Sequence, residues 1–278
     1  MLLDTSCIEE TLASLVQPKK NPLFTLLFQA ASYSLLSPGK RLRPQLVMAT
    51  AEALGKDPKT VLLPACAVEL LHTYSLIHDD LPCMDDDDMR RGKPTLHKVY
   101  PEGQAVLAGD LLLTLSFETL AKSPGFTPLQ ILEMIQVLAG RSGGEGLIGG
   151  QSLDLLFEEK TISWELLQQI HLGKTASLIS ACFEIGAIAS EASLSAKNTL
   201  AQIGEKIGLA FQIVDDILDA EQEEKKKKSS SVSLLGLSPA KALAEELLLS
   251  SLKLCEALNI EHSFLATHLL PRLVHRFL

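Results

Sequence analysis

Apolar residues recur at intervals of three and four along most of the chain, as between Leu12 and Val16 and again between Ile203 and Val214. This spacing is typical of helices that bury one face. Alternating runs rich in Val, Ile and Thr, which would indicate strands, are missing from the sequence. The pattern therefore predicts an all-α protein.

Glycine and proline interrupt the pattern at short breaks, and none is long enough for a convincing linker between domains. The breaks fall at Pro18–Pro22, Pro38–Gly39, Gly55–Pro58, Pro101–Gly103, Ser123–Pro128, Gly140–Gly146, Glu221–Ser233 and Pro271. We therefore expect one helical domain over residues 1–278, with about ten or more helices.

Composition adds limits to the function. Hydrophobic residues make up 46% of the chain and charged residues 21%, which excludes intrinsic disorder as the overall state. The 34 acidic side chains outnumber the 25 basic ones and give a net charge of −9. This balance argues against a nucleic-acid partner held by bulk positive charge.

The sequence also bears on location. No window reaches the roughly 18 uninterrupted apolar residues of a spanning helix. Asp4, Glu9 and Glu10 stand where a signal peptide would carry basic residues followed by an apolar run. Five scattered cysteines without a C-x-x-C pair favour reduced thiols. We expect a cytoplasmic protein with no membrane span.

The densest polar signal is a run with six carboxylates within ten residues, from Asp79 to Asp88. Such carboxylates repel one another unless a cation lies among them. Pro82 is expected to end the helix after Asp79 and Asp80, close to its C-terminal end, where cations are favoured. A few carboxylates with positions left for water and phosphate are how Mg²⁺ is usually bound. The alternative for an acidic run is a solvated loop.

A second acidic segment favours a metal site over a solvated loop. At about 100° per residue, Gln212, Asp215 and Asp219 share one stripe of a helix. The residues between them are largely apolar, so this helix is expected to be buried on its other sides. Two such segments suggest two walls that face each other across a cavity holding several divalent ions. A cavity of this kind points to a polyphosphate ligand.

Local basic groups fit the same ligand. Lys40, Arg41 and Arg43 lie together at an expected helix start, and Arg90 and Arg91 directly follow the first acidic run. Arginine makes forked hydrogen bonds to phosphate, and a helix start offers free backbone N–H groups. Each basic group taken singly could instead form a surface ion pair.

These segments together resemble the trans-isoprenyl diphosphate synthases, from about Pro38 to Asp219 and more weakly beyond. The motifs occur in the family's order: G-K-R-x-R-P, H-x-x-S-L-I-H-D-D-x-x-x-x-D with R-R-G-K-P-T, G-G-Q-x-x-D, K-T and F-Q-x-x-D-D-x-x-D. The resemblance implies an all-α fold of the isoprenoid synthase type, with helices around a central cavity, and a homodimer.

The resemblance also implies roles for individual residues. Asp79 and Asp85 are similar to the family's Mg²⁺ ligands, supported by Asp80, while Asp215 resembles the ligand of a third Mg²⁺ with Asp216 and Asp219 around it. The set implied for isopentenyl diphosphate is Lys40, Arg43, His72 and Arg91. The set implied for the allylic diphosphate is Arg90, Lys174, Thr175 and Gln212. Gln151 and Asp154 match a helix that lines the cavity.

The chemistry agrees with the resemblance. An allylic C–O bond can break heterolytically when Mg²⁺, Lys and Arg absorb the charge of the departing diphosphate. The double bond of isopentenyl diphosphate then attacks the cation, so no protein nucleophile is needed. A terpene cyclase is one alternative, but it has no second substrate for Lys40, Arg43, His72 and Arg91 to bind. A catalytically silent partner subunit is another, although it would be expected to lose the carboxylates.

The chain departs from the family after Asp219. We expect residues 220–233 to form a mobile flap loop, shorter than is usual in the family, with an acidic block, four lysines and a run of three serines. Lys228, with help from Lys225, is the candidate for the flap lysine that contacts the allylic diphosphate. The aromatic residue that the family has near Ser231 is absent.

Product length is expected to depend on side chains just upstream of Asp79. Ser75 and Tyr74 stand four and five residues before it. The resemblance implies that the bulkier Tyr74 closes the pocket after about three isoprene units, as in family members with an aromatic residue there. Farnesyl diphosphate is therefore the expected product, with geranylgeranyl diphosphate as the alternative.

One further motif is rejected. Gly144–Gly149 satisfies G-x-G-x-x-G, but it follows a helical pattern and not a strand, so a dinucleotide site is not expected. We interpret it as small residues that let helices approach closely. No motif surrounds His171, His262, His268 or His275.

Overall fold

A computed structural model describes residues 5–18, 21–158, 160–221 and 229–275. These residues are overwhelmingly helical, and the strands among them are only the two-residue β1 (Met89–Arg90) and β2 (Lys93–Pro94). The predicted all-α class is therefore confirmed. The chain divides into two compact units, Met1–Met48 with Lys59–Ile135 and Ala49–Pro58 with Gln136–Leu278, which are described separately below. The single domain over residues 1–278 stays a prediction.

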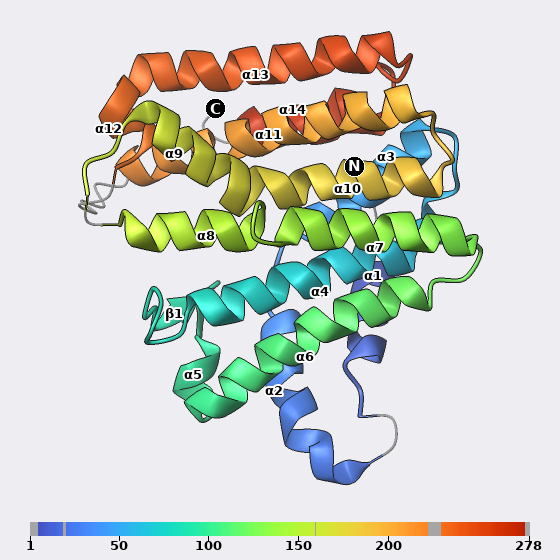
Figure 1. Ribbon diagram of the computed structural model, residues 1–278, viewed down its shortest axis with the longest axis vertical. Helices are drawn as coiled ribbons and strands as arrows, with labels where there is room; N and C mark the ends of the chain where they lie inside the picture. The colour runs from blue at the N-terminus through green and yellow to red at the C-terminus, as the bar shows by residue number, and fades with distance from the viewer. Residues whose placement is uncertain (1–4, 19–20, 159, 222–228, 276–278) are drawn as a thin grey trace. The chain divides into compact units, whose positions relative to one another are not determined.

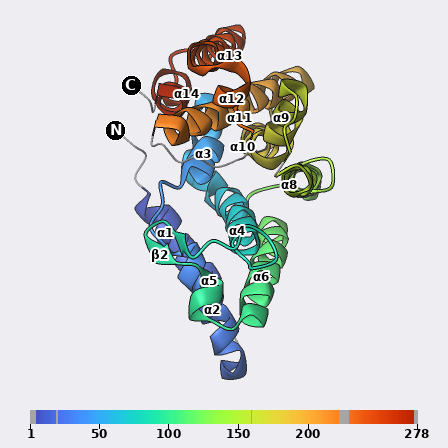
Figure 2. The same cartoon turned by 90° about the vertical axis from the view of Figure 1, so that its left-hand side faces the viewer.

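The first unit is built around α4, which packs along α6 and also contacts α1 and α2 (Figures 1 and 2). The short α5 packs on α6, and β1 pairs with β2 as an antiparallel hairpin. The helices of this unit are α1 (Ser6–Leu15), η1 (Pro22–Phe24), α2 (Thr25–Leu35), the start of α3 (Leu42–Ala53), η2 (Pro58–Val61), α4 (Leu62–Asp79), α5 (Leu96–Val99), α6 (Glu102–Ala121) and the start of α7 (Pro128–Ser142).

Helix α4 is buried on nearly every side. Every residue from Pro64 to Ser75 is buried, which is typical of a helix at the centre of a core. The helix ends at Asp79 with Asp80 as its C-cap. Pro82 follows three residues later, and the helix end predicted from it is confirmed. The first acidic run therefore begins where the central helix of this unit stops.

The second unit is built around the 28-residue helix α11 (Leu194–Glu221), which packs against α10 and α13. Helix α9 continues through the π-helical turn η3 into α10, and η3 packs on α8. The remaining helices are α8 (Leu147–Leu156), α9 (Trp164–His171), η3 (Leu172–Ala176), α10 (Ser177–Ala189), α12 (Ser231–Leu235), α13 (Leu237–Ala257), η4 (Leu265–Leu269) and α14 (Leu270–Val274).

Glycine allows α8 to approach η3 closely. A Cβ atom at Gly150 would lie 2.0 Å from the backbone nitrogen of Lys174, and one at Gly173 would lie 2.9 Å from Cα of Gly150. Backbone atoms cannot move aside as the end of a flexible side chain can. Gly150 and Gly173 therefore serve packing between helical segments. Of the motif Gly144–Gly149 interpreted from the sequence, Gly146 has a neighbour on another helix, Ser177 Oγ at 2.9 Å from its Cβ position, whereas Gly144 has none within 4 Å.

We expect Gly150→Ala to lower the free energy of unfolding of the protein by about 1–3 kcal/mol, because the added methyl group overpacks a backbone contact. Gly140→Ala is the matched control, since nothing lies within 4 Å of a Cβ at that exposed position of α7. That control should be neutral or slightly stabilising. Urea unfolding followed by circular dichroism measures both, and equal stability of the two variants would contradict the packing role.

Three segments are long and apolar enough to cross a membrane by length and composition: Pro58–Asp79, Glu102–Ala121 and Trp164–Ala189. They qualify by the average hydropathy of the segment, which a few charged residues lower only in part. None of them is an uninterrupted apolar run of about 18 residues. Within the structure 72%, 44% and 78% of their most apolar windows are buried. Two of the three are thus largely buried, and the absence of a membrane span stays a prediction.

The segment predicted as a flap loop, residues 220–233, is shorter than expected on both sides. Helix α11 continues to Glu221, and Ser231 begins α12 with Ser230 as its N-cap. Residues 222–228, including Lys225 and Lys228, lie outside the described residues.

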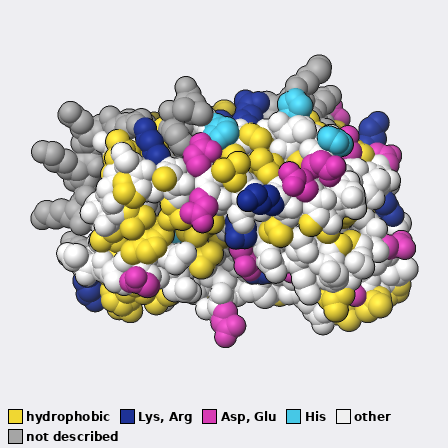
Figure 3. Space-filling model, turned by 90° about the horizontal axis from the view of Figure 1, so that it is seen from above, with side chains coloured by type: hydrophobic (Ala, Val, Ile, Leu, Met, Phe, Trp, Pro, Cys, Tyr) yellow, Lys and Arg dark blue, Asp and Glu magenta, His cyan; other side chains and the backbone are white. Residues whose placement is uncertain are grey.

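Charged side chains of both signs lie among hydrophobic ones on the face of the molecule shown in Figure 3. Among the described residues of that face, no continuous field of Lys and Arg is visible. This mixture agrees with the acidic net charge of −9.

Candidate active site

The acidic loop after α4 folds back on the helix end. The backbone N–H of Asp85 donates to the backbone oxygen of Asp79 at 2.9 Å. Within the loop, the N–H groups of Met84 and Asp86 both donate to the oxygen of Leu81, at 2.9 Å and 3.2 Å. The backbones of Asp79 and Asp85, six positions apart in sequence, are thereby held next to each other, and both residues are partly exposed.

Arg90 lies among these carboxylates and compensates part of their charge. Its Nε atom is 2.6 Å from Oδ1 of Asp80, and its Nη2 atom is 3.4 Å from Oδ2 of Asp87. Burial raises the pKa of Asp80, and the Arg90 charge opposes that shift. The hairpin of β1 and β2 pairs Arg90 with Lys93 and so fixes the backbone position from which the Arg90 side chain extends. The cation that the acidic run requires is therefore present within the same unit.

A second group of cations surrounds His72 of α4. A nitrogen of Arg43 lies 3.1 Å from Nε2 of His72. Burial, followed by the charges of Arg43, Arg91, Arg90 and Arg41, holds the pKa of His72 well below its usual value of 6.5. His72 is therefore neutral at pH 7 and retains one N–H donor.

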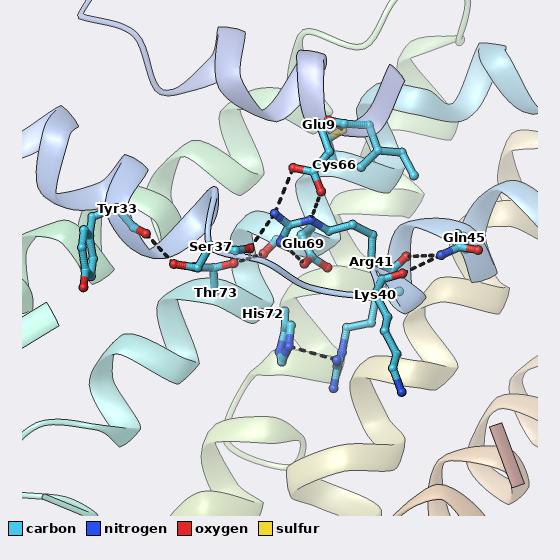
Figure 4. A network of polar contacts seen from close by, with 12 residues as sticks. Glu9, Tyr33, Ser37, Lys40, Arg41, Gln45, Cys66, Glu69, His72 and Thr73 are labelled. Atoms are coloured by element: carbon cyan, nitrogen blue, oxygen red, sulfur yellow. Dashed lines mark hydrogen bonds and ion pairs between the residues drawn. The ribbon is translucent and has the colours of Figure 1, made fainter. Parts of the chain in front are cut away.

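Arg91 and Lys40 belong to the same region of the first unit. A Cβ atom at Gly39 would lie 2.9 Å from Nη1 of Arg91, so the glycine lets this guanidinium lie against the loop before α3. The exposed Lys40 side chain leaves that loop in the direction away from Glu9 and Glu69 (Figure 4). Below, "basic cluster" means Lys40, Arg43, His72 and Arg91.

Tyr74 is a buried side chain on α4 and is 4% exposed. Its ring lies edge-on to the ring of His78 with centroids 5.6 Å apart, and among the described residues its hydroxyl has no hydrogen-bond partner. Burial, with a smaller effect of Asp79, raises the pKa of Tyr74 to about 12. The neighbouring Ser75 donates from Oγ to the backbone oxygen of His72 at 2.9 Å.

In the second unit, the π-helical turn η3 presents Lys174 and Thr175. Lys174 Nζ lies 2.6 Å from Oδ2 of Asp154 on α8, and Thr175 Oγ1 donates to Oε1 of Gln212 on α11 at 2.9 Å. A π-helical turn inside a helix frequently marks a functional position. Gln151 on α8 is 6% exposed, and within the described part of the chain neither atom of its amide has a hydrogen-bond partner.

The aspartates of α11 differ in their surroundings. Asp216 Oδ2 accepts from the N–H and from Oγ of Ser231, both at 2.7 Å, and lies 3.8 Å from Nε2 of His171. Asp215 is partly exposed and Asp219 is exposed. Asp216 thus binds the start of α12, whereas Asp215 and Asp219 lie one turn apart on the same helix.

The predicted residues that the structure describes divide between the two units. The first unit holds Asp79, Asp80, Asp85, Lys40, Arg43, His72, Arg90, Arg91, Tyr74 and Ser75, and the second holds Gln151, Asp154, Lys174, Thr175, Gln212, Asp215, Asp216 and Asp219. Lys228 lies outside the described residues.

A family model described as polyprenyl synthetase matches residues 24–232. The chain belongs to this family. The polyprenyl synthetases are prenyltransferases, and the family predicted from the five motifs is confirmed.

Known relatives agree with this membership. The chain is 44% identical over 248 residues to the farnesyl diphosphate synthase of Haemophilus influenzae, with 84% of each chain covered. It is 49% identical to that of Bacillus subtilis over 69% of this chain and 66% of the relative. It is 42% identical to geranylgeranyl pyrophosphate synthase 7 of Arabidopsis thaliana, over 80% of this chain and 68% of the relative.

A solved structure is similar over nearly the whole chain. The apo FPP/GFPP synthase of Zymomonas mobilis matches with a TM-score of 0.86 and 37% identity, covering 98% of this chain and 94% of that one. The geranyltransferase of Helicobacter pylori matches with a TM-score of 0.81 and 38% identity, covering 96% and 91%. These polyprenyl synthetases support the all-α fold of the isoprenoid synthase type.

Members of this family generally depend on magnesium, and the donor chemistry of the chain fits that ion. Asp79, Asp85, Asp215 and Asp219 offer carboxylate oxygens, which hard cations prefer. Among the described residues no three His, Cys, Asp or Glu side chains are grouped as a ready-made metal site. Mg²⁺ is usually bound by only one or two carboxylates, with water and substrate phosphate completing its shell, so binding of that ion does not require such a group.

Sequence reasoning missed some residues of this polyprenyl synthetase that contact the predicted ones. The sequence indicates Arg41 only as one cation of its motif, yet it forms ion pairs with Glu9 and Glu69. Ser231 was noted only for a missing aromatic, yet it binds Asp216. All three contacts join residues at least 15 positions apart, and no local pattern could have signalled them.

Proposed function

We propose that this chain catalyses the Mg²⁺-dependent head-to-tail (1′-4) condensation of isopentenyl diphosphate with dimethylallyl or geranyl diphosphate, giving farnesyl diphosphate and diphosphate. The observation that carries the proposal is the basic cluster in the same unit as the acidic loop of Asp79 and Asp85. Two diphosphate groups need two sets of cations, and a metal site alone accounts for one of them.

The basic cluster is proposed to bind isopentenyl diphosphate. Arg43 and Arg91 offer forked donors for phosphate oxygens, and Lys40 adds a point charge. The neutral His72 adds one N–H without adding charge. The proposed ligands of the allylic diphosphate are Arg90, Lys174, Thr175 and Gln212.

Bond breaking is proposed to occur at the allylic C–O bond. When bound, Mg²⁺ supplies positive charge that stabilises the departing diphosphate. We propose that its ligands are Asp79, Asp85, Asp215 and Asp219. The family resemblance implies three ions. Arg90 and Lys174 neutralise further charge on the same diphosphate. Asp80, which holds Arg90 at 2.6 Å, orients that guanidinium.

Bond making follows without a protein nucleophile. The double bond of isopentenyl diphosphate attacks the allylic cation and forms a C–C bond, and loss of a proton restores a double bond. The departing diphosphate is the proposed proton acceptor. Apolar, mostly buried neighbours such as Tyr74 keep water from the cation.

The relatives named farnesyl diphosphate synthase support a farnesyl product. Relatives named geranylgeranyl pyrophosphate synthase are also similar, at 42% identity for one of them, so that product remains the alternative. The bulk of Tyr74 favours the shorter chain.

The direct test uses the purified protein alone with Mg²⁺, isopentenyl diphosphate and geranyl diphosphate. We expect release of diphosphate and a C15 alcohol after dephosphorylation. Release of diphosphate only when isopentenyl diphosphate is present separates this function from a terpene cyclase. Absence of any product until a partner synthase is added would instead support the silent-subunit alternative.

The family resemblance also leads us to propose a homodimer acting in the cytoplasm. Exposed apolar side chains such as Leu107 on α6 and Leu129 on α7 favour association. Light scattering should give about twice the chain mass of 30.1 kDa at micromolar concentration. A mass of one chain would contradict the dimer.

A further inference from the structure

We propose that Arg41 is a positioning residue for isopentenyl diphosphate, anchored by Glu9 of α1 and Glu69 of α4 so that Lys40 and Arg43 are held in their binding positions. This inference rests on the proposed function, because it concerns the substrate assigned to the basic cluster. It also gives helix α1, which carries none of the predicted site residues, a part in binding that substrate.

The Arg41 side chain is 1% exposed and surrounded by acceptors. Its Nε and Nη2 atoms donate to the two carboxylate oxygens of Glu9 at 2.6 Å and 3.0 Å, in the forked arrangement (Figure 4). Nη1 donates to Glu69 at 3.1 Å, and Nη2 also donates to the backbone oxygen of Ser37 at 3.0 Å. A guanidinium used in this way has little capacity left for a diphosphate, so Arg41 is not itself a phosphate ligand.

The backbone at Arg41 needs such an anchor. Its φ of 47° lies in the left-handed region, which costs a residue with a Cβ about 1–2 kcal/mol. Gln45 stabilises this turn, since its Nε2 donates to the backbone oxygen of Lys40 at 2.6 Å and to that of Arg41 at 3.3 Å. The left-handed residue separates the directions of neighbouring side chains: Arg41 points to Glu9 and Glu69, whereas Lys40 points away from them (Figure 4).

Charge gives a second reason for the anchor. Arg41 Nη1 and Arg91 Nη1 lie 3.5 Å and 2.9 Å from the position of a Cβ at Gly39, so the two guanidinium groups are close. Burial and the neighbouring guanidinium groups, Arg41 among them, lower the pKa of Arg91, and Glu69 opposes that shift. Burial likewise disfavours the charge of Arg41, but Glu9 and Glu69 together raise its pKa. Glu9 and Glu69 thus balance the charge of Arg41, which is the cation of this motif that is not proposed to bind substrate.

If the Arg41 contacts only stabilised the fold, their loss would leave the affinity for isopentenyl diphosphate unchanged. Kinetics therefore separates a structural role from a positioning role. The main variant is Glu9→Gln, which removes charge from a side chain that is 41% exposed and so is expected to fold. We expect the KM for isopentenyl diphosphate to rise about five- to tenfold, because one charged anchor of the loop is lost. The KM for geranyl diphosphate should stay within about twofold of wild type. Glu10→Gln is the matched control, since Glu10 is the exposed neighbour on the same helix.

A second variant tests Arg41 itself. Arg41→Lys keeps the charge but cannot bridge two carboxylates in the forked geometry, so it should raise the same KM at least as much as Glu9→Gln. Calorimetric titration of isopentenyl diphosphate into each variant without the allylic substrate checks binding independently of turnover. Equal changes in both KM values, or none, or unchanged calorimetric affinity, would overturn the proposal. If wild-type protein does not condense the substrates at all, it is the proposed function that has failed.

Discussion

Asp79→Ala is expected to lower kcat by about 10³-fold, because the carboxylate is proposed to bind Mg²⁺ whose charge stabilises the departing diphosphate by several kcal/mol. The partly exposed side chain lies at the end of α4, after the buried stretch Pro64–Ser75, so the fold should survive its loss. Asp215→Ala should have an effect of similar size, since this partly exposed residue belongs to the other acidic segment. Steady-state release of diphosphate at saturating substrate measures both.

Asp88→Asn is the matched control for the first variant. Asp88 belongs to the same acidic run, but its exposed carboxylate pairs with Lys98 at 2.7 Å. Its replacement should leave kcat within about twofold of wild type, because exposed ion pairs contribute little. Circular dichroism and the melting temperature verify that each variant is folded. If Asp79→Ala keeps near-normal turnover, or needs no more Mg²⁺ than wild type, the metal role of Asp79 is wrong.

The end of α4 shows what the sequence could predict. Pro82 removes a backbone donor and restricts the residue before it, so the helix had to stop near Asp79 whatever the rest of the chain does. The stripe of Gln212, Asp215 and Asp219 on one helix follows in the same way from a period of about 3.6 residues. Local chemistry determines both features, and the structure has both.

Long-range pairing shows what the sequence could not predict. The Arg41–Glu9 and Arg41–Glu69 contacts join residues 32 and 28 positions apart, and many other glutamates could have served equally well on pattern alone. The close approach of α8 to the π-helical turn at Lys174, where a Cβ at Gly150 would lie 2.0 Å from the Lys174 nitrogen, is likewise a property of packing.

Tyr74→Ala is expected to change the main product from a C15 chain to longer chains. In the proposed function, the growing chain extends from its diphosphate along α4, where the bulky side chain of Tyr74 stands five residues before Asp79, just over one helical turn away. The Tyr74 ring packs against the ring of His78. The His78 ring in turn lies against α6, since its Nε2 would be 2.1 Å from a Cβ at Gly109, so neither ring has much room to move aside. Replacing a buried aromatic ring by a methyl group leaves a cavity that a further isoprene unit can occupy.

Tyr74→Phe separates volume from hydrogen bonding. The Tyr74 hydroxyl has no hydrogen-bond partner among the described residues, so removing it should change neither stability nor product by a measurable amount. Loss of the whole ring in Tyr74→Ala can cost about 3–5 kcal/mol of stability, so products are compared at a temperature where both variants are folded. Chromatography of the dephosphorylated products should show mainly a C15 alcohol from wild type and Tyr74→Phe, and C20 or longer from Tyr74→Ala. A C20 alcohol from wild type, or unchanged products from Tyr74→Ala, would mean that another side chain limits the product length. A Tyr74 ring that closes the pocket would stop the growing chain at C15, and its removal would allow longer chains.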